Sequence, residues 1–221
     1  MAGIIPLKDA SREPSRVPVV TTLLIVANCL VFTLELLGGD AFVTRWAVVP
    51  ADITAGRHLI TIVTAMFLHG GWMHIVGNMI FLWTFGPQIE DAMGPRPYVT
   101  FYLLSGCVAF VAQIAATPDS TIPTLGASGA IAGVMGAFLV TYPADRIKTV
   151  VLLGWFVRVT FVPAVLLIGL WFIIQLLSQV GSVAQAQTGG VAYVAHVGGF
   201  LFGAATARPF ERFRRVARRG T

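Results

Sequence analysis

Apolar runs long enough to cross a membrane recur along the whole of this 221-residue chain. A helix needs about 20 apolar residues to cross a hydrocarbon core of ~30 Å. Six such runs are present, at residues 18–38, 73–90, 98–117, 126–142, 162–180 and 191–207. Only 11% of the residues are charged, whereas about a quarter are charged in soluble domains. The pattern predicts an all-α polytopic membrane protein, a bundle of six transmembrane helices whose main solvent is the lipid bilayer.

The basic residues predict how the bundle is oriented, because Lys and Arg in short loops concentrate on the cytoplasmic side of a membrane. An even number of spans puts both termini on one side, and that side then holds 13 of the 15 basic residues. The opposite side keeps only Arg45 and Arg57. We therefore expect both termini to be cytoplasmic.

The chain divides into three parts. Residues 1–17, interrupted by Pro6 and Pro14, are expected to form a cytoplasmic lead-in to which no fold is assigned. Residues 18–207 form the six-span domain, whose first run reads as an uncleaved signal anchor. Residues 208–221 form a basic cytoplasmic tail. Because this tail directly follows a span, its charge favours contact with an anionic leaflet rather than with nucleic acid.

Two segments outside the spans are apolar enough to lie at the membrane interface. The external segment 39–72 contains Trp46 and Pro50 together with several apolar residues, a composition typical of interfacial segments. Residues 147–161 are also apolar but are interrupted by Arg158. We expect Arg158 to snorkel to the interface, so that this segment is not a seventh span.

Polar side chains at membrane depth are functional candidates, because burying them in lipid is costly. The strongest candidates are His74 and Asn78 in the second run, Ser128 in the fourth and His196 in the sixth. All lie a few residues inside the external end of their run, so they share one depth at ~1.5 Å per residue. His74 and Asn78 are four residues apart and project from one helix face.

Small residues surround the serine and accompany the second histidine. Ser128 stands in the sequence Gly126-Ala127-Ser128-Gly129, where glycines leave room for a substrate backbone. Stripes of small residues allow helices to pack closely in lipid. One stripe is Gly129, Gly133 and Gly136, and the other is Gly199, Gly203 and Ala207 on the run that carries His196. We expect contact between these two runs to bring His196 within hydrogen-bonding distance of Ser128.

This arrangement predicts nucleophilic catalysis, since a neutral imidazole can take the proton of a serine hydroxyl. His74, Asn78 and the backbone N–H of Ser128 are the candidate donors for an oxyanion. Glu35 is the one acidic residue near a span interior, so we expect a Ser-His dyad without a carboxylate partner.

Other polar residues are read as structural. We expect His69 to hydrogen-bond within the external cap, and Glu90 and Asp91 to form a solvated cluster with Arg96. A metal site at His69, His74 and His196 is not favoured, because neither carboxylates nor thiolates accompany them.

These motifs resemble those of the rhomboid intramembrane serine proteases. The resemblance rests on His69-Gly-Gly-Trp-Met-His74-Ile-Val-Gly-Asn78, on Gly126-Ala-Ser128-Gly129, on Ala195-His196-Val-Gly-Gly199 and on the six-span layout. It implies a six-helix rhomboid-like bundle with Ser128 as nucleophile, His196 as base, and His74 and Asn78 as oxyanion donors. Gly126, Gly129, Gly199 and His69 would support the motif. Two positions depart from the family pattern: Thr61 stands near the place of a frequent arginine, and Ala132 replaces an aromatic residue found in some relatives.

The expected function is a serine endopeptidase without cofactor or metal, cleaving transmembrane segments of other proteins near the external membrane face. Its partners would be transmembrane protein substrates and the lipid bilayer, with no nucleic acid, and its location a bacterial inner membrane. Two alternatives stay open. A non-catalytic relative would bind membrane segments without cutting them. A channel or transporter would use the polar groups as a pathway, although these stop in the outer half of the bundle.

Overall fold

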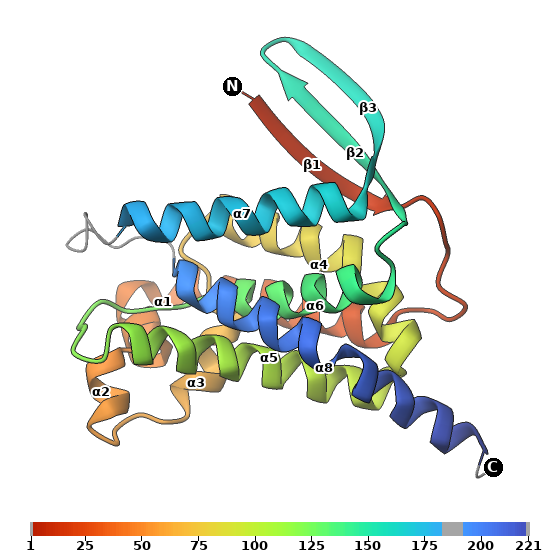
Figure 1. The fold of residues 1–221 in the computed structure, drawn as a ribbon. Helices are drawn as coiled ribbons and strands as arrows, with labels where there is room; N and C mark the ends of the chain where they lie inside the picture. Colours follow the sequence, from red (N-terminus) through yellow and green to blue (C-terminus); the bar gives the residue numbers. More distant parts are fainter. Residues whose placement is uncertain (1, 183–191, 220–221) are drawn as a thin grey trace.

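The computed structural model describes residues 2–182 and 192–219. Its long helices lie side by side, with α6 enclosed among the others (Figure 1). They follow the predicted apolar runs in order and are α1 (Val19–Trp46), α4 (Trp72–Met93), α5 (Pro95–Ala116), α6 (Ser128–Thr141), α7 (Ala164–Ser182) and α8 (Tyr193–Arg219).

The lengths of these helices do not confirm six crossings. Within the described residues, α1 and α5 are long and apolar enough to span a membrane, and a third span results if the bent pair Thr61–Phe67 and Trp72–Met93 counts as one. The helix α6 and the part Ala164–Leu177 of α7 are apolar but shorter. The short α6 is buried from Gly129 to Phe138, so most of its length is enclosed by protein rather than by lipid.

The segment 39–72, which was expected to be external, packs against the bundle. Helix α1 kinks at Gly39, whose φ is +61°, and then continues to Trp46, eight residues beyond the expected end of the first run. The short helices α2 (Pro50–Thr54), α3 (Thr61–Thr64) and η1 (Ala65–Phe67) follow. Ala65 and Met66 are fully buried in a cluster with residues of α5, while Leu59 and Ile60 remain exposed.

A small sheet corrects the prediction of an all-α fold. Strands β1 (Ala2–Asp9), β2 (Arg146–Leu153) and β3 (Phe156–Pro163) form an antiparallel sheet in that order. The expectation of no fold for residues 1–17 was therefore wrong, and residues 147–161, which were expected at the membrane interface without a seventh span, form two strands. Residues 147–161 are rich in β-branched and aromatic residues, which favour strands. Gly154, with φ +62°, begins the two-residue turn between β2 and β3, a position that favours glycine.

Ionic contacts fix the N-terminal segment to the loop before β2. Arg12 donates to both carboxylate oxygens of Asp145 and lies 3.8 Å from the centroid of the Tyr142 ring. The hydrogen bond from Arg12 lowers the pKa of Asp145, whereas burial raises the pKa of the neighbouring Asp9 to about 6. The segment that was expected to lack structure is thus an ordered part of the fold.

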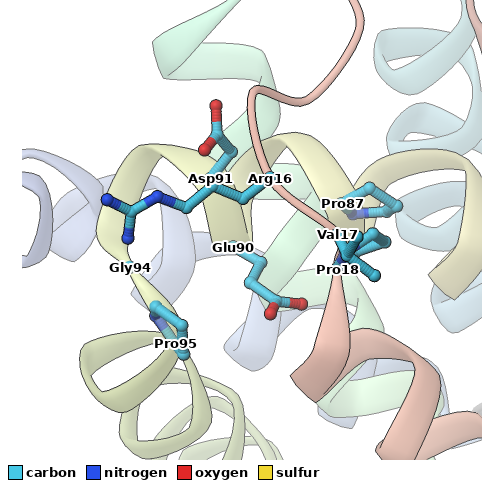
Figure 2. A pocket seen from close by; sticks show the side chains of 8 residues that line it. All are labelled: Arg16, Val17, Pro18, Pro87, Glu90, Asp91, Gly94 and Pro95. Atoms are coloured by element: carbon cyan, nitrogen blue, oxygen red, sulfur yellow. The ribbon is translucent and has the colours of Figure 1, made fainter.

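Glu90 does not form the expected solvated cluster with Arg96. Its carboxylate accepts hydrogen bonds from the backbone N–H groups of Val20 and Thr21 at 2.9 and 2.7 Å. Glu90 is only 3% exposed. It therefore caps the start of α1, where backbone donors lack partners inside the helix. Asp91, next to it, accepts from Ser15. Figure 2 shows both carboxylates beside the small cavity between the start of α1 and the end of α4.

Glycines bring α6 and α8 into backbone contact, as the two stripes of small residues predict. A Cβ atom added at Gly203 would lie 1.9 Å from the carbonyl oxygen of Gly133. One added at Gly199 would lie 2.1 Å from the carbonyl oxygen of Gly129, and one at Gly136 would lie 2.2 Å from that of Phe200. Such distances leave no room for any side chain, so this contact depends on glycine.

We predict that Gly203→Ala destabilises the protein by about 1–3 kcal/mol, because overpacking forces two backbones apart. Gly169→Ala on α7 is the matched control, since nothing lies within 4 Å of its added Cβ, and helix propensity favours alanine there by up to ~1 kcal/mol. Thermal unfolding in detergent would measure both. Equal melting temperatures for the two variants would contradict the packing argument.

Candidate active site

Ser128 and His196 meet through a short hydrogen bond. The Nε2 atom of His196 lies 2.7 Å from the Oγ atom of Ser128. Ser128 is the first residue of α6 and His196 lies in the first turn of α8, so both stand at the same end of the glycine-packed helix pair. The close approach of the two backbones allows such short side chains to touch.

Gln175 on α7 holds the other side of the imidazole ring. Its Oε1 atom lies 2.7 Å from His196 Nδ1, and both residues are 8% exposed. An amide oxygen can only accept a hydrogen bond, so Nδ1 must carry the proton of a neutral ring. Nε2 then has a free lone pair facing the hydroxyl of Ser128. This is the tautomer that a general base requires.

Sequence reasoning missed Gln175, although a signal was present. It is a polar residue inside the apolar run 162–180, and the rule applied to the histidines would have selected it. Trp171, one helical turn earlier, places its ring centroid 5.8 Å from that of His196. Tyr193 on α8 places its ring centroid 6.4 Å from that of His196, so aromatic contacts to His196 come from α7 and α8, while Ala132 on α6 is buried and small.

The ring of His74 faces the space beside Ser128. Its Nδ1 accepts a hydrogen bond from the backbone N–H of Gly70 at 3.2 Å, so a neutral ring carries its proton on Nε2. A Cβ atom added at Gly126 would lie 3.0 Å from that Nε2 and 3.5 Å from Ser128 Oγ. Glycine at position 126, with φ +130°, therefore keeps open the space between the two side chains.

Two further donors are available near this space. Asn78 stands one helical turn after His74 on α4 and is 8% exposed, and its Nδ2 has no hydrogen-bond partner within the described residues. Buried amide groups normally have partners, so this donor is available to a ligand. The backbone N–H of Ser128, at the start of α6, has no acceptor within its own helix.

The loop before α4 is held by Glu35. Its carboxylate accepts the backbone N–H of His69 at 3.0 and 3.1 Å, and His69 is 2% exposed. The rings of His69 and His74 are 5.2 Å apart in an edge-on contact. The backbone of His69 is thus bound within the loop, but neither ring nitrogen of His69 has a hydrogen-bond partner among the described residues, so the expected side-chain hydrogen bond is not observed. Thr61, at the start of α3, is buried, and its hydroxyl donates a hydrogen bond to the backbone carbonyl of His58 at 2.7 Å.

The structure thus brings Ser128, His196 and His74 together, with Asn78 on the same helix as His74. A hydroxyl, a base in the required tautomer and preorganised donors are the parts needed for acyl transfer. Gly126 keeps the space open, while Gly129 and Gly199 allow the helix contact that places the dyad.

Comparisons with known proteins identify a family and relatives of this chain. A family model described as Rhomboid domain matches residues 56–212. Rhomboid-like protease 5 of Toxoplasma gondii is 32% identical over 161 residues, which cover 69% of this chain and 17% of that protein. Rhomboid protease GluP of Bacillus subtilis is 30% identical over 133 residues, or 58% of this chain and 26% of that protein. Presenilin-associated rhomboid-like protein A, mitochondrial, of Danio rerio is 34% identical over 92 residues, which cover 41% of this chain and 24% of that protein. The matches span at most 26% of the length of these relatives.

The geometry predicts that a fluorophosphonate forms one covalent adduct, on Ser128, because the neighbouring imidazole activates this hydroxyl. Ser128→Ala and His196→Ala should form none. Intact-mass measurement of detergent-purified protein would count the adducts, and the melting temperature of each variant would control for folding. An unlabelled but folded wild-type protein would contradict the assignment of Ser128 as an activated nucleophile.

Proposed function

Because this chain belongs to the rhomboid family, we propose that it is an intramembrane serine endopeptidase acting through a Ser128–His196 dyad. The family and the apolar helices make it a multi-pass membrane protein. The observation that carries the proposal is the 2.7 Å contact between Ser128 Oγ and His196 Nε2, with the opposite ring nitrogen held by Gln175.

In the proposed reaction, Ser128 Oγ attacks the carbonyl carbon of the scissile peptide bond while its proton passes to His196 Nε2. Gln175 Oε1 keeps the ring in place and accepts from Nδ1–H throughout. His74 Nε2–H, Asn78 Nδ2–H and the Ser128 N–H are the donors for the oxyanion. His196 then gives its proton to the leaving amine as the peptide C–N bond breaks. A water molecule hydrolyses the acyl-enzyme by the same steps and restores the serine.

The proposed substrates are transmembrane segments of other proteins. A peptide bond in an intact helix hides its carbonyl in the helical hydrogen-bond ladder, which lipid stabilises. Substrates should therefore contain locally weak helix, such as Gly or Pro residues, near the cut. Since Ser128 and His196 stand at the ends of their helices, we propose that cleavage occurs near one membrane face.

We further propose that all six long helices cross the bilayer and that both termini lie on the cytoplasmic side, which puts the dyad near the external face. The distribution of basic residues supports this orientation. The proposed compartment is a bacterial inner membrane. Relatives occur in bacteria and in mitochondria, so the orientation rests on the charges and not on the relatives.

The activity would be tested with protein reconstituted into vesicles together with a single-span substrate that carries Gly and Pro near its external end. We expect cleavage by wild type and a loss of about 10³-fold or more with Ser128→Ala. Asn78→Ala should lower the rate by about 10²–10³-fold through loss of an oxyanion donor. A substrate with a leucine-rich helix is the control and should stay intact. Cleavage retained by folded Ser128→Ala protein would exclude the dyad.

The role of Gln175 gives a separate prediction. Gln175→Leu has a similar volume but cannot accept from Nδ1–H, and we expect about a tenfold slower rate, the equivalent of ~1.4 kcal/mol for one buried hydrogen bond. Gln175→Glu keeps an acceptor oxygen and adds a negative charge, so it should restore activity and move the acidic limb of the pH–rate profile to higher pH. If Gln175 were only a packing residue, Gln175→Leu would be the better tolerated of the two and the profile would not move.

A further inference from the structure

One face of the three-stranded sheet carries an ordered pattern of side chains. Residues opposite each other on neighbouring strands point to the same face of a sheet. The pairing places three cross-strand rows on this face: Lys8, Lys148 and Phe161; Ile5, Val150 and Val159; Gly3, Leu152 and Val157. Together with Trp155 in the turn, these residues are called here the outer face.

The opposite face fixes the sheet to the bundle. Its residues Ile147 and Thr149 are fully buried, and Thr84 of α4 donates to the backbone carbonyl of Pro6 in β1 at 3.2 Å. The base of the sheet is thereby anchored, and the turn between β2 and β3 is its free end (Figure 1).

The outer face grades from basic at its base to apolar at its tip. Trp155 is 99% exposed, and Val157 and Val159 are 64% and 51% exposed. Lys8 and Lys148 face each other across β1 and β2 near the base. Soluble surfaces avoid contiguous apolar patches of this kind. Aromatic and aliphatic side chains followed by lysines at a fixed level are typical of segments that lie in a membrane interface.

The sheet also lies next to the end of a helix, α7, that is proposed to cross the bilayer. Strand β3 leads directly into α7, whose Leu166, Leu170 and Leu177 are 62%, 51% and 68% exposed. The sheet rises from the end of the bundle at which α7 begins, and its free end stands away from the helices on the side of α7 (Figure 1). The exposed apolar residues of the outer face and of α7 therefore belong to consecutive elements of the chain.

We propose that the outer face docks on the lipid bilayer at the membrane face where β3 passes into α7. The turn with Trp155 lies at the boundary of headgroups and acyl chains, while Lys8 and Lys148 contact lipid phosphates. This inference rests on the proposed placement of α7 across the bilayer. The open strand edges limit the depth, because unpaired backbone groups are not tolerated in the hydrocarbon core.

Two observations favour lipid over a second copy of this chain. The edge strand β1 carries Lys8 and an irregularity between Pro6 and Lys8, and the edge strand β3 carries the exposed Arg158. Charged residues and bulges disfavour edge-to-edge pairing. An open cavity of about 340 Å³ is lined by Phe161 together with basic and acidic side chains, among them Lys8, Arg12, Lys148, Asp9 and Glu13. Lys8 lies 4.0 Å from Glu13 and Arg12 donates to Asp145, so within the described residues Lys148 is the basic group of this cavity that no carboxylate pairs, and it can contact a lipid phosphate.

Spin labels would test the position of the outer face in nanodiscs that contain phosphatidylcholine and phosphatidylglycerol. Cys29 and Cys107 would first be replaced by Ala, and a nitroxide attached at Val157→Cys. Leu170→Cys on α7 is the lipid reference, and Asp119→Cys in the loop between α5 and α6, where the wild-type residue is exposed, is the aqueous reference. Collision rates with oxygen and with a water-soluble nickel chelate report depth. The Ser128→Ala background keeps this test independent of proteolysis.

We expect the ratio of oxygen to nickel collisions at Val157 to shift from the Asp119 value toward the Leu170 value. Lys8→Gln together with Lys148→Gln should reduce this shift in anionic discs and leave it unchanged in pure phosphatidylcholine. A label as accessible to nickel as the one at Asp119 would overturn the proposal. So would an immobilised label shielded from both reagents, which would indicate contact with a second copy. An aqueous reading at Leu170 would overturn the underlying placement of α7.

Discussion

Everything at the candidate site depends on the contact between the backbones of α6 and α8. Carbonyl oxygens of one helix occupy the positions that side chains would need on the other, at Gly133 opposite Gly203 and at Gly129 opposite Gly199. In lipid there is no hydrophobic driving force between helices, so close van der Waals packing must hold them together. That packing fixes the distance between Ser128 and His196 with little dependence on flexible side chains.

Much of this arrangement could be predicted from residue types and spacing. Ser128, His196 and His74 stand out because polar groups are rare in apolar runs, and the glycine stripes indicate which helices touch. Each of the six predicted apolar runs corresponds to one long helix, in the same order along the chain. The number of crossings could not be fixed in this way, because a helix enclosed by protein, such as α6, can be shorter than the bilayer is thick.

Other features depend on contacts between residues far apart in the chain, which single-sequence patterns do not reveal. Strand β1 pairs with a strand more than a hundred residues away, and residues 1–17 alone show no reason to be ordered. From the sequence, Glu90 is expected to be a solvated carboxylate. Only the folded chain shows that the start of α1 lies beside it and donates hydrogen bonds to it. Gln175 has a signal of its own, but its partner on α8 is visible only in the folded chain.

Gln175 sits on a different helix from both members of the dyad. Ser128 and His196 belong to the closely packed pair α6 and α8, whereas the group that fixes the imidazole tautomer comes from α7, whose outward surface is apolar and exposed. Any outward displacement of α7 would remove the acceptor from Nδ1–H and free the ring to exchange its proton between its two nitrogens. The hydroxyl would then lose its proton acceptor for part of the time. In the proposed mechanism, full reactivity of Ser128 would therefore require α7 to stay packed beside α8.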